Sequence, residues 1–253
     1  MELFFVIVLS LLSGSFLNVC IYRIPRKKSI VLPRSHCTQC QKTLGVFDLI
    51  PIVSYLFLKG KCRFCKHSIS FVYPLVEALT SLGSVLLFLK FSLSPLFFFY
   101  TFIFYILITI TFIDLKHFII PDAITLPSLF LGFLLSFFGF SITWGDSLLG
   151  IFLGGGILYG MGTLYYIFTQ KEGMGGGDIK LMAMLGAFLG SKAVFFIILA
   201  SSILGSVGGL VMLLMTRQSK DTPIPFGPYI ALSSLIYIFY GDALLTWYFG
   251  DFF

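Results

Sequence analysis

Four carboxylates lie within or at the ends of strongly apolar segments, namely Glu77, Asp114, Asp122 and Asp178. Acidic side chains are costly inside a membrane, so residues of this kind are candidates for function. Asp114 ends one apolar segment, and Asp178 begins another after three glycines at 175–177. Two facing carboxyl groups that share a proton can hydrolyse an amide, because one accepts a proton from the attacking water while the other supplies a proton toward the carbonyl oxygen or leaving amine. Asp114 and Asp178 are therefore the candidate catalytic pair.

The spacing of these two aspartates also leaves other roles open. Asp178 could cap its helix and interact with the N-terminal dipole, and Asp114 could pair with Lys116 at the interface. The glycines before Asp178 would allow a substrate strand to approach the backbone closely. The chain contains no Gly-x-Ser-x-Gly, no His-Glu-x-x-His and no Gly-Lys-Ser/Thr ending to its glycine run. It therefore lacks the signatures of a serine hydrolase, a zinc peptidase and a phosphate loop.

Two Cys-x-x-Cys pairs, separated by 21 residues, form a second candidate site at Cys37, Cys40, Cys62 and Cys65. Four thiolates at this spacing can surround a zinc ion tetrahedrally and leave no position for a substrate, so we expect a structural zinc. The alternatives are two disulfides, which a reducing cytoplasm disfavours, or free thiols. His36 and His67 adjoin the pairs and could each replace a thiolate, whereas Cys20 is interpreted as a small apolar residue.

The composition indicates that these residues are positioned by membrane helices. Hydrophobic residues make up 58% of the 253, charged residues make up 11%, and the mean hydropathy is +1.00. These values exclude a disordered chain, a nucleic-acid-binding domain and an ordinary soluble enzyme. The alternation of an outer-membrane barrel is absent, so we expect an all-α polytopic membrane helix bundle of about eight spanning helices. The expected spans are 3–22, 72–89, 95–113, 123–141, 147–168, 179–190, 193–215 and 226–240.

The positive charge is concentrated after the first expected span. Residues 23–73 hold ten of the 17 Lys and Arg but one acid, Asp48. Because basic residues mark the cytoplasmic side, we expect a multi-pass protein with this insert inside and anionic lipid near it. The first span lacks a basic n-region and a small-x-small cleavage site, so we interpret it as a retained helix. The expected organisation is helix 1 at 1–22, a cytoplasmic zinc-binding insert at 23–71, and a membrane core at 72–253 that contains the candidate aspartates.

Short motifs recur along nearly the whole chain, at 14–19, 22–25, 34–40, 50–51, 59–65, 73–77, 114–122, 175–180 and 225–228. In this order they resemble the type IV prepilin peptidase family, the leader peptidase/N-methyltransferases of pilus assembly, type II secretion and competence. The segment Gly175-Gly-Gly-Asp178 resembles the GxGD signature that the family shares with presenilin-like aspartic proteases.

The resemblance implies that Asp114 and Asp178 are catalytic and that Asp122 is a cap or turn residue. It also implies a substrate, a prepilin or pseudopilin with a short basic leader inside and a hydrophobic helix in the membrane. Cleavage would occur at the cytoplasmic face of the bacterial inner membrane, and the new N-terminus would be methylated from S-adenosylmethionine. The resemblance also links the insert at 23–71 to methyl transfer and the core at 72–253 to the aspartic peptidase activity. Asn18, Arg23 and Glu77 lie near the insert and are candidates to hold this cofactor or the amine. Glu77 could instead pair with a Lys or Arg of the insert.

Three other functions stay open at this point. The chain could cleave without methylating, as archaeal preflagellin peptidases do, although the long insert at 23–73 disfavours this. It could be a transporter or proton-conducting protein that uses Asp114 and Asp178 as a relay, or a scaffold subunit of a secretion machine. Two small-residue pairs, Gly156-x-x-x-Gly160 and Gly205-x-x-x-Gly209, are expected to bring helices close together.

Overall fold

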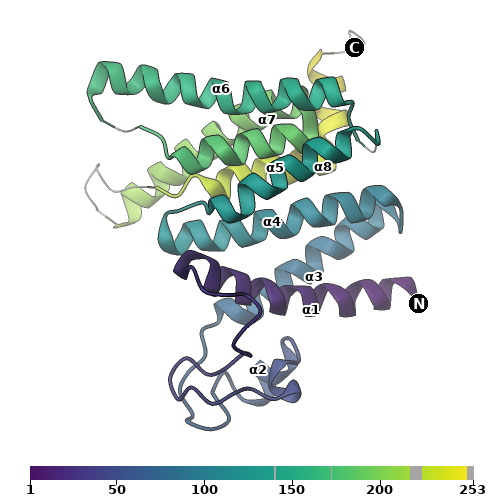
Figure 1. Ribbon diagram of the computed structural model, residues 1–253, viewed down its shortest axis with the longest axis vertical. Helices are drawn as coiled ribbons and strands as arrows, with labels where there is room; N and C mark the ends of the chain where they lie inside the picture. The colour runs from purple at the N-terminus through teal and green to yellow at the C-terminus, as the bar shows by residue number, and fades with distance from the viewer. Residues whose placement is uncertain (140, 172, 217–223, 250–253) are drawn as a thin grey trace. The chain divides into compact units, whose positions relative to one another are not determined.

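The computed structural model describes residues 1–139, 141–171, 173–216 and 224–249, and these ranges contain helices but no strand. The predicted all-α fold class is therefore confirmed. The elements in chain order (Figure 1) are α1 Glu2–Arg23, η1 Ile24–Arg26, η2 Val46–Leu49, α2 Val53–Phe57, α3 Val72–Phe91, α4 Pro95–His117, α5 Asp122–Ser136, α6 Trp144–Thr169, α7 Gly176–Thr216 and α8 Gly227–Phe249.

Five helices of the described part are long and apolar enough to cross a membrane. They cover Glu2–Arg26, Val72–Phe91, Pro95–His117, Trp144–Thr169 and Gly176–Met212. α5 is apolar but shorter, and α8 begins with the eighth expected span, 226–240, but continues to Phe249. The structure thus confirms a polytopic helical protein, while the count of eight crossings stays a prediction.

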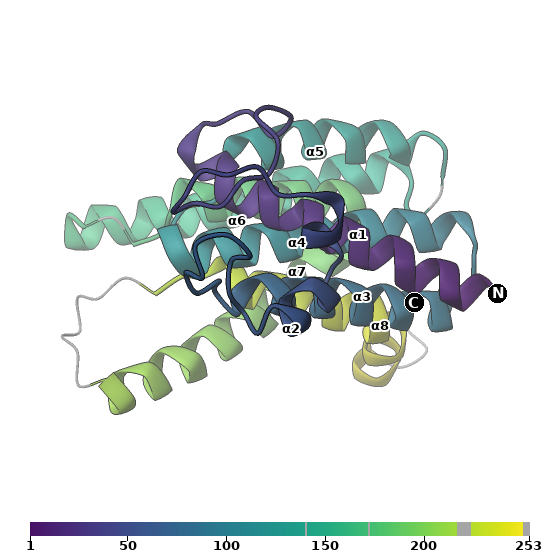
Figure 2. The same cartoon turned by 90° about the horizontal axis from the view of Figure 1, so that it is seen from below.

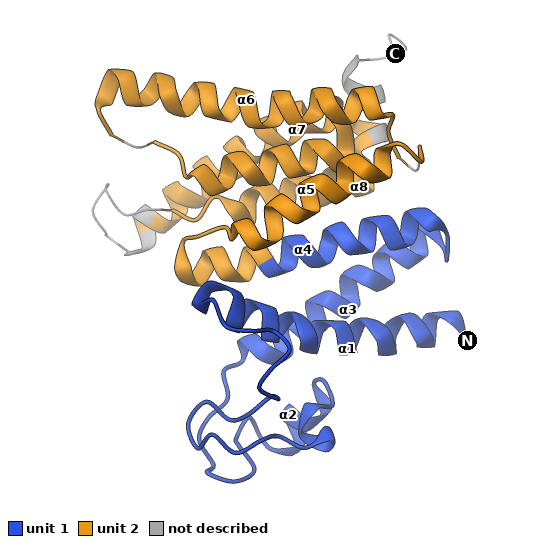
Figure 3. Cartoon of the chain, viewed as in Figure 1, with its two compact units in different colours: residues 1–109 blue, residues 110–253 orange. Residues whose placement is uncertain are grey.

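The chain divides into two compact units, residues 1–109 and 110–253, and α4 contributes to both (Figure 3). In the first unit, α1 and α3 pack closely at Gly14, where a Cβ atom would lie 2.8 Å from Cα of Glu77. The hydroxyl of Ser10 donates to that of Ser81 at 3.2 Å across the same interface. The basic insert joins the end of α1 to the start of α3, so this helix pair carries it (Figure 1).

In the second unit, α6 and the first part of α7 approach each other backbone to backbone. A Cβ atom on Gly186 would collide with the carbonyl group of Gly150, and one on Gly154 would lie 2.6 Å from the carbonyl oxygen of Met182. Residues 181–190 of α7 are buried throughout. The first part of α7 is therefore the core helix of this unit.

Gly190 divides α7 into two helical runs, as the sequence predicted for 179–190 and 193–215. Its φ of 83° and ψ of 179° are essentially restricted to glycine. Asp146 of α6 accepts the backbone N–H of Ser191 at 3.2 Å, and so caps the second run. Met182 and Ile198 line one crevice, although a straight helix would separate them by about 24 Å. The chain therefore folds back at Gly190, and the second run is the light green helix of Figure 2.

One of the two expected close-packing pairs, Gly156 and Gly160, was assigned to the wrong face of its helix. Nothing lies within 4 Å of a Cβ atom built on Gly156 or Gly160. Gly205 and Gly209 contact the side chains of Phe226 and Ile224 rather than a helix backbone. The helix contact is made instead by Gly150 and Gly154, which lie on the face of α6 that meets α7.

Changing Gly186 to alanine is expected to destabilise the fold by about 1–3 kcal/mol, because the added methyl group forces α6 away from α7. The matched control is Gly156→Ala, whose methyl group meets open space. The control is expected to be neutral or slightly stabilising, because alanine favours a helix over glycine by ~1 kcal/mol. Thermal unfolding of both variants in one detergent measures the difference, and equal stabilities would refute the close-packing argument.

Candidate active site and metal centre

Asp114 lies in the last turn of α4, and its side chain is held by the start of α8. The residue is 5% exposed, and the backbone N–H of Gly227 donates to its Oδ2 atom at 2.9 Å. A Cβ atom on Gly227 would lie 2.8 Å from the same oxygen, so the approach requires glycine. Gly227 is the first residue of α8, and the positive end of a helix dipole favours a carboxylate there. Gly227 belongs to the motif at 225–228, whose residue types alone do not indicate this role.

Asp178 lies in the first turn of α7, after the glycine run. Its backbone N–H donates to the carbonyl oxygen of Gly175 at 3.1 Å, and its side chain is partly buried. Gly177 packs against the loop between α4 and α5, where a Cβ atom would lie 2.8 Å from Cβ of Ile120. The absence of a side chain at Gly177 therefore brings the start of α7 against the segment that follows Asp114.

The two candidate catalytic aspartates are brought into one electrostatic environment. Asp114 and Asp178 belong to the same unit, 110–253, and their carboxyl groups lie close enough to interact electrostatically. Two carboxyl groups at close range can share one proton. The fold thus joins residues 64 positions apart by ending α4 where α7 begins.

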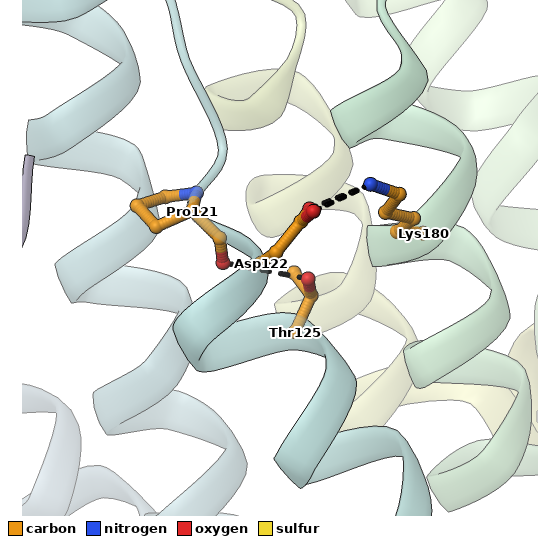
Figure 4. A network of polar contacts seen from close by, with 4 residues as sticks. All are labelled: Pro121, Asp122, Thr125 and Lys180. Atoms are coloured by element: carbon orange, nitrogen blue, oxygen red, sulfur yellow. Dashed lines mark hydrogen bonds and ion pairs between the residues drawn. The ribbon is translucent and has the colours of Figure 1, made fainter.

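Asp122 and Lys180 form a separate ion pair beside these aspartates (Figure 4). Nζ of Lys180 lies 2.7 Å from each carboxylate oxygen of Asp122, and the side chains are 41% and 54% exposed respectively. Asp122 begins α5 but makes no side-chain cap, because Pro121 is the N-cap residue. The interpretation of Asp122 as a turn residue fits its place, while its side chain links α5 to α7 rather than capping α5.

A shallow apolar crevice lies next to the acid pair in sequence and in space. Met182 lies one helical turn after Asp178, Met174 lies four residues before it, and Phe226 precedes Gly227. These side chains line the crevice together with residues of α6, the second run of α7 and α8. Its volume is about 20 Å³, which is room for about one water molecule, so a larger apolar group enters only if the flexible methionine side chains move aside.

The four cysteines of the insert form one cluster, as predicted. The Sγ atoms of Cys37, Cys40, Cys62 and Cys65 all lie within 4.8 Å of one another, and those of Cys37 and Cys65 are 3.8 Å apart. Four sulfurs at ~2.3 Å from a tetrahedral zinc lie ~3.8 Å apart. All four are free thiols rather than disulfides, and neither His36 nor His67 joins the cluster. The donor set therefore fits a tetrahedral metal ion held by sulfur alone.

The two halves of the cluster are structural repeats, 25 residues apart. The N–H of Cys37 donates to Lys42 O at 3.0 Å, and the N–H of Cys62 donates to His67 O at 2.9 Å. Gln41 and Lys66 occupy equivalent positions, each with φ of 58°. This repeated turn points the backbone N–H groups of Cys65 and Phe64 at the Cys62 sulfur, which lowers the pKa of Cys62 to about 6. The thiolate is the form that binds a metal ion.

Arg63, which follows Cys62 directly, forms an ion pair within the insert. Its Nε atom lies 2.9 Å from Oδ1 of Asp48, whose side chain is 4% exposed. Arg63 therefore links the second cysteine turn to η2 rather than only offsetting thiolate charge. Asp48 is the single acid of the insert, and this ion pair uses it.

The candidate residues for methyl transfer are buried in the first unit, and each binds the main chain. Asn18 donates to Tyr73 O at 3.0 Å, and Glu77 accepts the N–H of Ile52 at 2.8 Å. Arg23 donates to Ser29 O at 2.9 Å and to Pro33 O at 2.7 Å. The carboxylate of Glu77 therefore binds a backbone N–H of the insert and not the Lys or Arg side chain considered above. All three residues attach the insert or its flanks to α1 and α3.

Together these features define a helical membrane protein with an aspartate pair at helix ends and a four-cysteine cluster after its first helix. Two family models match the chain, the bacterial peptidase A24 N-terminal domain over residues 8–91 and the type IV leader peptidase family over residues 101–210. The chain therefore belongs to the type IV leader peptidase family, which confirms the resemblance drawn from its motifs.

Similar curated proteins share nearly the whole length of the chain. A protein of Aeromonas salmonicida is 36% identical, over 96% of this chain and 92% of its own. Proteins of Pseudomonas aeruginosa and Legionella pneumophila are also 36% identical, over 96% and 95% of this chain and 91% and 92% of their own. Each is named prepilin leader peptidase/N-methyltransferase. No solved structure matches the chain.

Proposed function

We propose that the protein is an aspartic endopeptidase that removes the leader peptide of type IV prepilins or pseudopilins. The observation that carries the proposal is that α4 ends with Asp114 where α7 begins with Asp178, with Gly177 packed against Ile120 in the loop that follows α4. One carboxyl group accepts a proton from the attacking water, and the other supplies a proton toward the carbonyl oxygen or the leaving amine. The N–H of Gly227 keeps Asp114 oriented.

The location of the reaction is part of the same proposal. Lys116 follows Asp114 by two residues, Lys180 follows Asp178 by two, and the insert is strongly basic. This distribution favours a cytoplasmic position for the active site in the bacterial inner membrane. The substrate is a membrane-anchored prepilin, and nucleic acid is not a partner in the proposed reaction.

The second proposed activity is N-methylation of the new N-terminus with S-adenosylmethionine, carried by the first unit. Methyl transfer depends mainly on placing the amine in line with the methyl group. Asn18, Arg23 and Glu77 use their side chains on main-chain groups, so we assign them to positioning the insert rather than to direct contact with the cofactor. The cysteine cluster holds a structural zinc ion, which supplies folding energy to the insert and leaves no coordination position for substrate.

One experiment tests both activities. The purified protein is incubated with a prepilin and isotope-labelled S-adenosylmethionine, and the products are read by mass spectrometry. Truncation with a label on the new N-terminus is the expected result. Truncation without label would reduce the function to a peptidase, and an intact prepilin would favour a proton-relay, transport or scaffold role.

Changing Gly227 to alanine is expected to lower the rate of leader cleavage about 10- to 100-fold, because a hydrogen bond to a charged group contributes ~1.5–3 kcal/mol. The methyl group would displace the start of α8 from Asp114. Initial rates of leader removal measure the effect, with Gly145→Ala as the control, since a Cβ atom there meets nothing within 4 Å. Wild-type rates in Gly227→Ala would remove the backbone N–H from the mechanism.

A further inference from the structure

A pocket of about 330 Å³ lies in the first unit, where α1 meets the first loops of the insert. α1 contributes Phe16, Val19 and Arg23, which lie on one helix face and span ~10 Å along its axis. The remaining wall comes from residues 30–35 and 44–49. The pocket therefore starts beside the membrane-spanning part of α1 and ends at the basic insert.

The polar side of the pocket is positively charged. Arg23 is 7% exposed, and its guanidinium is fixed by Ser29 O and Pro33 O, which use two of its five N–H groups. Arg34 also lines the pocket and is exposed. None of the lining residues is acidic, and Asp48, the single acid of residues 23–73, pairs with Arg63. The pocket thus offers one preorganised and one adaptable cation without a neutralising carboxylate.

The rest of the wall is apolar and continues outward onto exposed apolar surface. Val31 and Val46 are 76% and 77% exposed, and their neighbours Leu32 and Phe47 are equally accessible, at 68% and 75%. Exposed apolar tips beside many basic residues are typical of segments that lie in a membrane interface.

α1 presents a matching apolar stripe. Phe5, Leu9, Leu12 and Phe16 recur at helical spacing, and all are more than half exposed. Phe16 belongs to both the stripe and the pocket. An apolar chain can therefore follow α1 from the membrane to the cationic end of the pocket.

We propose that this pocket binds one anionic phospholipid, with its phosphate at Arg23 and Arg34 and an acyl chain along the exposed stripe of α1. Guanidinium groups bind phosphate through charge-assisted, often bidentate hydrogen bonds. S-adenosylmethionine has a carboxylate that one guanidinium can bind, but its sulfonium and ammonium groups give it a net positive charge, so it fits a pocket with two arginines and no acid less well than a phosphate does. A basic leader peptide would be repelled for the same reason.

The bound lipid stabilises the insert, because the pocket wall is continuous with the first cysteine turn. The N–H of Leu44 donates to Ser35 O at 2.9 Å, and both residues line the pocket. His36 and Thr43 form an isolated bridge next to this bond, directly before Cys37. A lipid that holds these two segments therefore supports the turn that carries the first two cysteines.

The test uses the full-length protein in detergent, titrated with phosphatidylglycerol or phosphatidylcholine and observed by native mass spectrometry. We expect one tightly held phosphatidylglycerol and no equivalent phosphatidylcholine. Arg34→Gln is expected to weaken this binding at least about 10-fold. Lys28→Gln removes the same charge from an exposed position outside the pocket and is expected to change binding less than about 2-fold. Val46→Asp places a carboxylate at an exposed wall position and is expected to abolish the tight site even if Arg34→Gln folds poorly.

Several outcomes would overturn the proposal. Equal losses in Arg34→Gln and Lys28→Gln would reduce it to general surface attraction. Glycerophosphoglycerol that binds as tightly as the lipid would show that the pocket recognises the phosphate headgroup and not an acyl chain. Displacement of the lipid by S-adenosylmethionine would identify a cofactor pocket. Leader cleavage, measured in parallel, is expected to persist in detergent in all three variants, so the lipid site and the proposed peptidase can fail independently.

Discussion

Replacing Asp114 or Asp178 by asparagine is expected to lower the rate of leader cleavage by at least about 10³-fold, because asparagine can neither accept nor supply the transferred proton. The two residues act on one shared proton, so the double variant is expected to be no slower than either single variant. The measurement is the initial rate of prepilin truncation under single-turnover conditions, with equal amounts of folded protein.

The matched control for this prediction is Asp122→Asn. Asp122 lies in the same region and carries the same functional group, but it is paired with Lys180 and largely accessible. An exposed ion pair contributes ~0.2–1 kcal/mol, so we expect a small change in stability and a cleavage rate within about 3-fold of wild type. Leader removal that persists in both Asp114→Asn and Asp178→Asn would contradict the proposed peptidase. If Asp122→Asn alone abolished leader removal, Asp122 would belong to the active site.

Changing Cys62 to serine is expected to abolish stoichiometric zinc binding and to unfold the insert. Cys62 is 3% exposed and belongs to the four-sulfur cluster. A structural zinc ion contributes ~10–16 kcal/mol of apparent binding free energy, which is more than a segment of this size can replace by its own core. Elemental analysis gives the zinc content, and limited proteolysis of residues 27–70 reports folding of the insert.

Cys20→Ala provides the control for the metal prediction. Cys20 is a buried free thiol of α1 that does not belong to the cluster. The control is expected to retain one zinc per chain, and the Cys62 variant is expected to retain Asp114 and Asp178 in their own unit. Zinc content that stays at one per chain after all four cluster cysteines are changed would exclude the proposed centre.

The aspartates and cysteines could be identified from the sequence because their side chains carry the chemistry. An acid at the end of an apolar segment and four cysteines in two pairs are unusual enough to stand out without a structure. Gly227 could not be identified in this way. Its contribution is a backbone N–H at 2.9 Å from Asp114, and every residue except proline has such a group.

The glycines at which α6 packs against α7 also could not be identified from the sequence. The pattern Gly156-x-x-x-Gly160 matches the expected motif but faces no helix, whereas Gly150 and Gly154 face α7. A helix repeats every 3.6 residues, so glycines a few positions apart can lie on different faces. The face that meets a neighbour depends on where that neighbour lies, and the local pattern does not contain this information.

The sequence by itself determined the membrane character, the helical class, the family, and the residue types of the two candidate centres. Each of these follows from composition or from motifs that are local in the chain. The tertiary structure alone decided that Gly150 and Gly154 are the residues of α6 that meet α7, that α8 begins against Asp114, and that Arg23 and Arg34 line one pocket with the outer face of α1. These relations join residues that are distant in sequence or separated by an irregular loop, and they depend on how closely the backbones pack rather than on any one side chain.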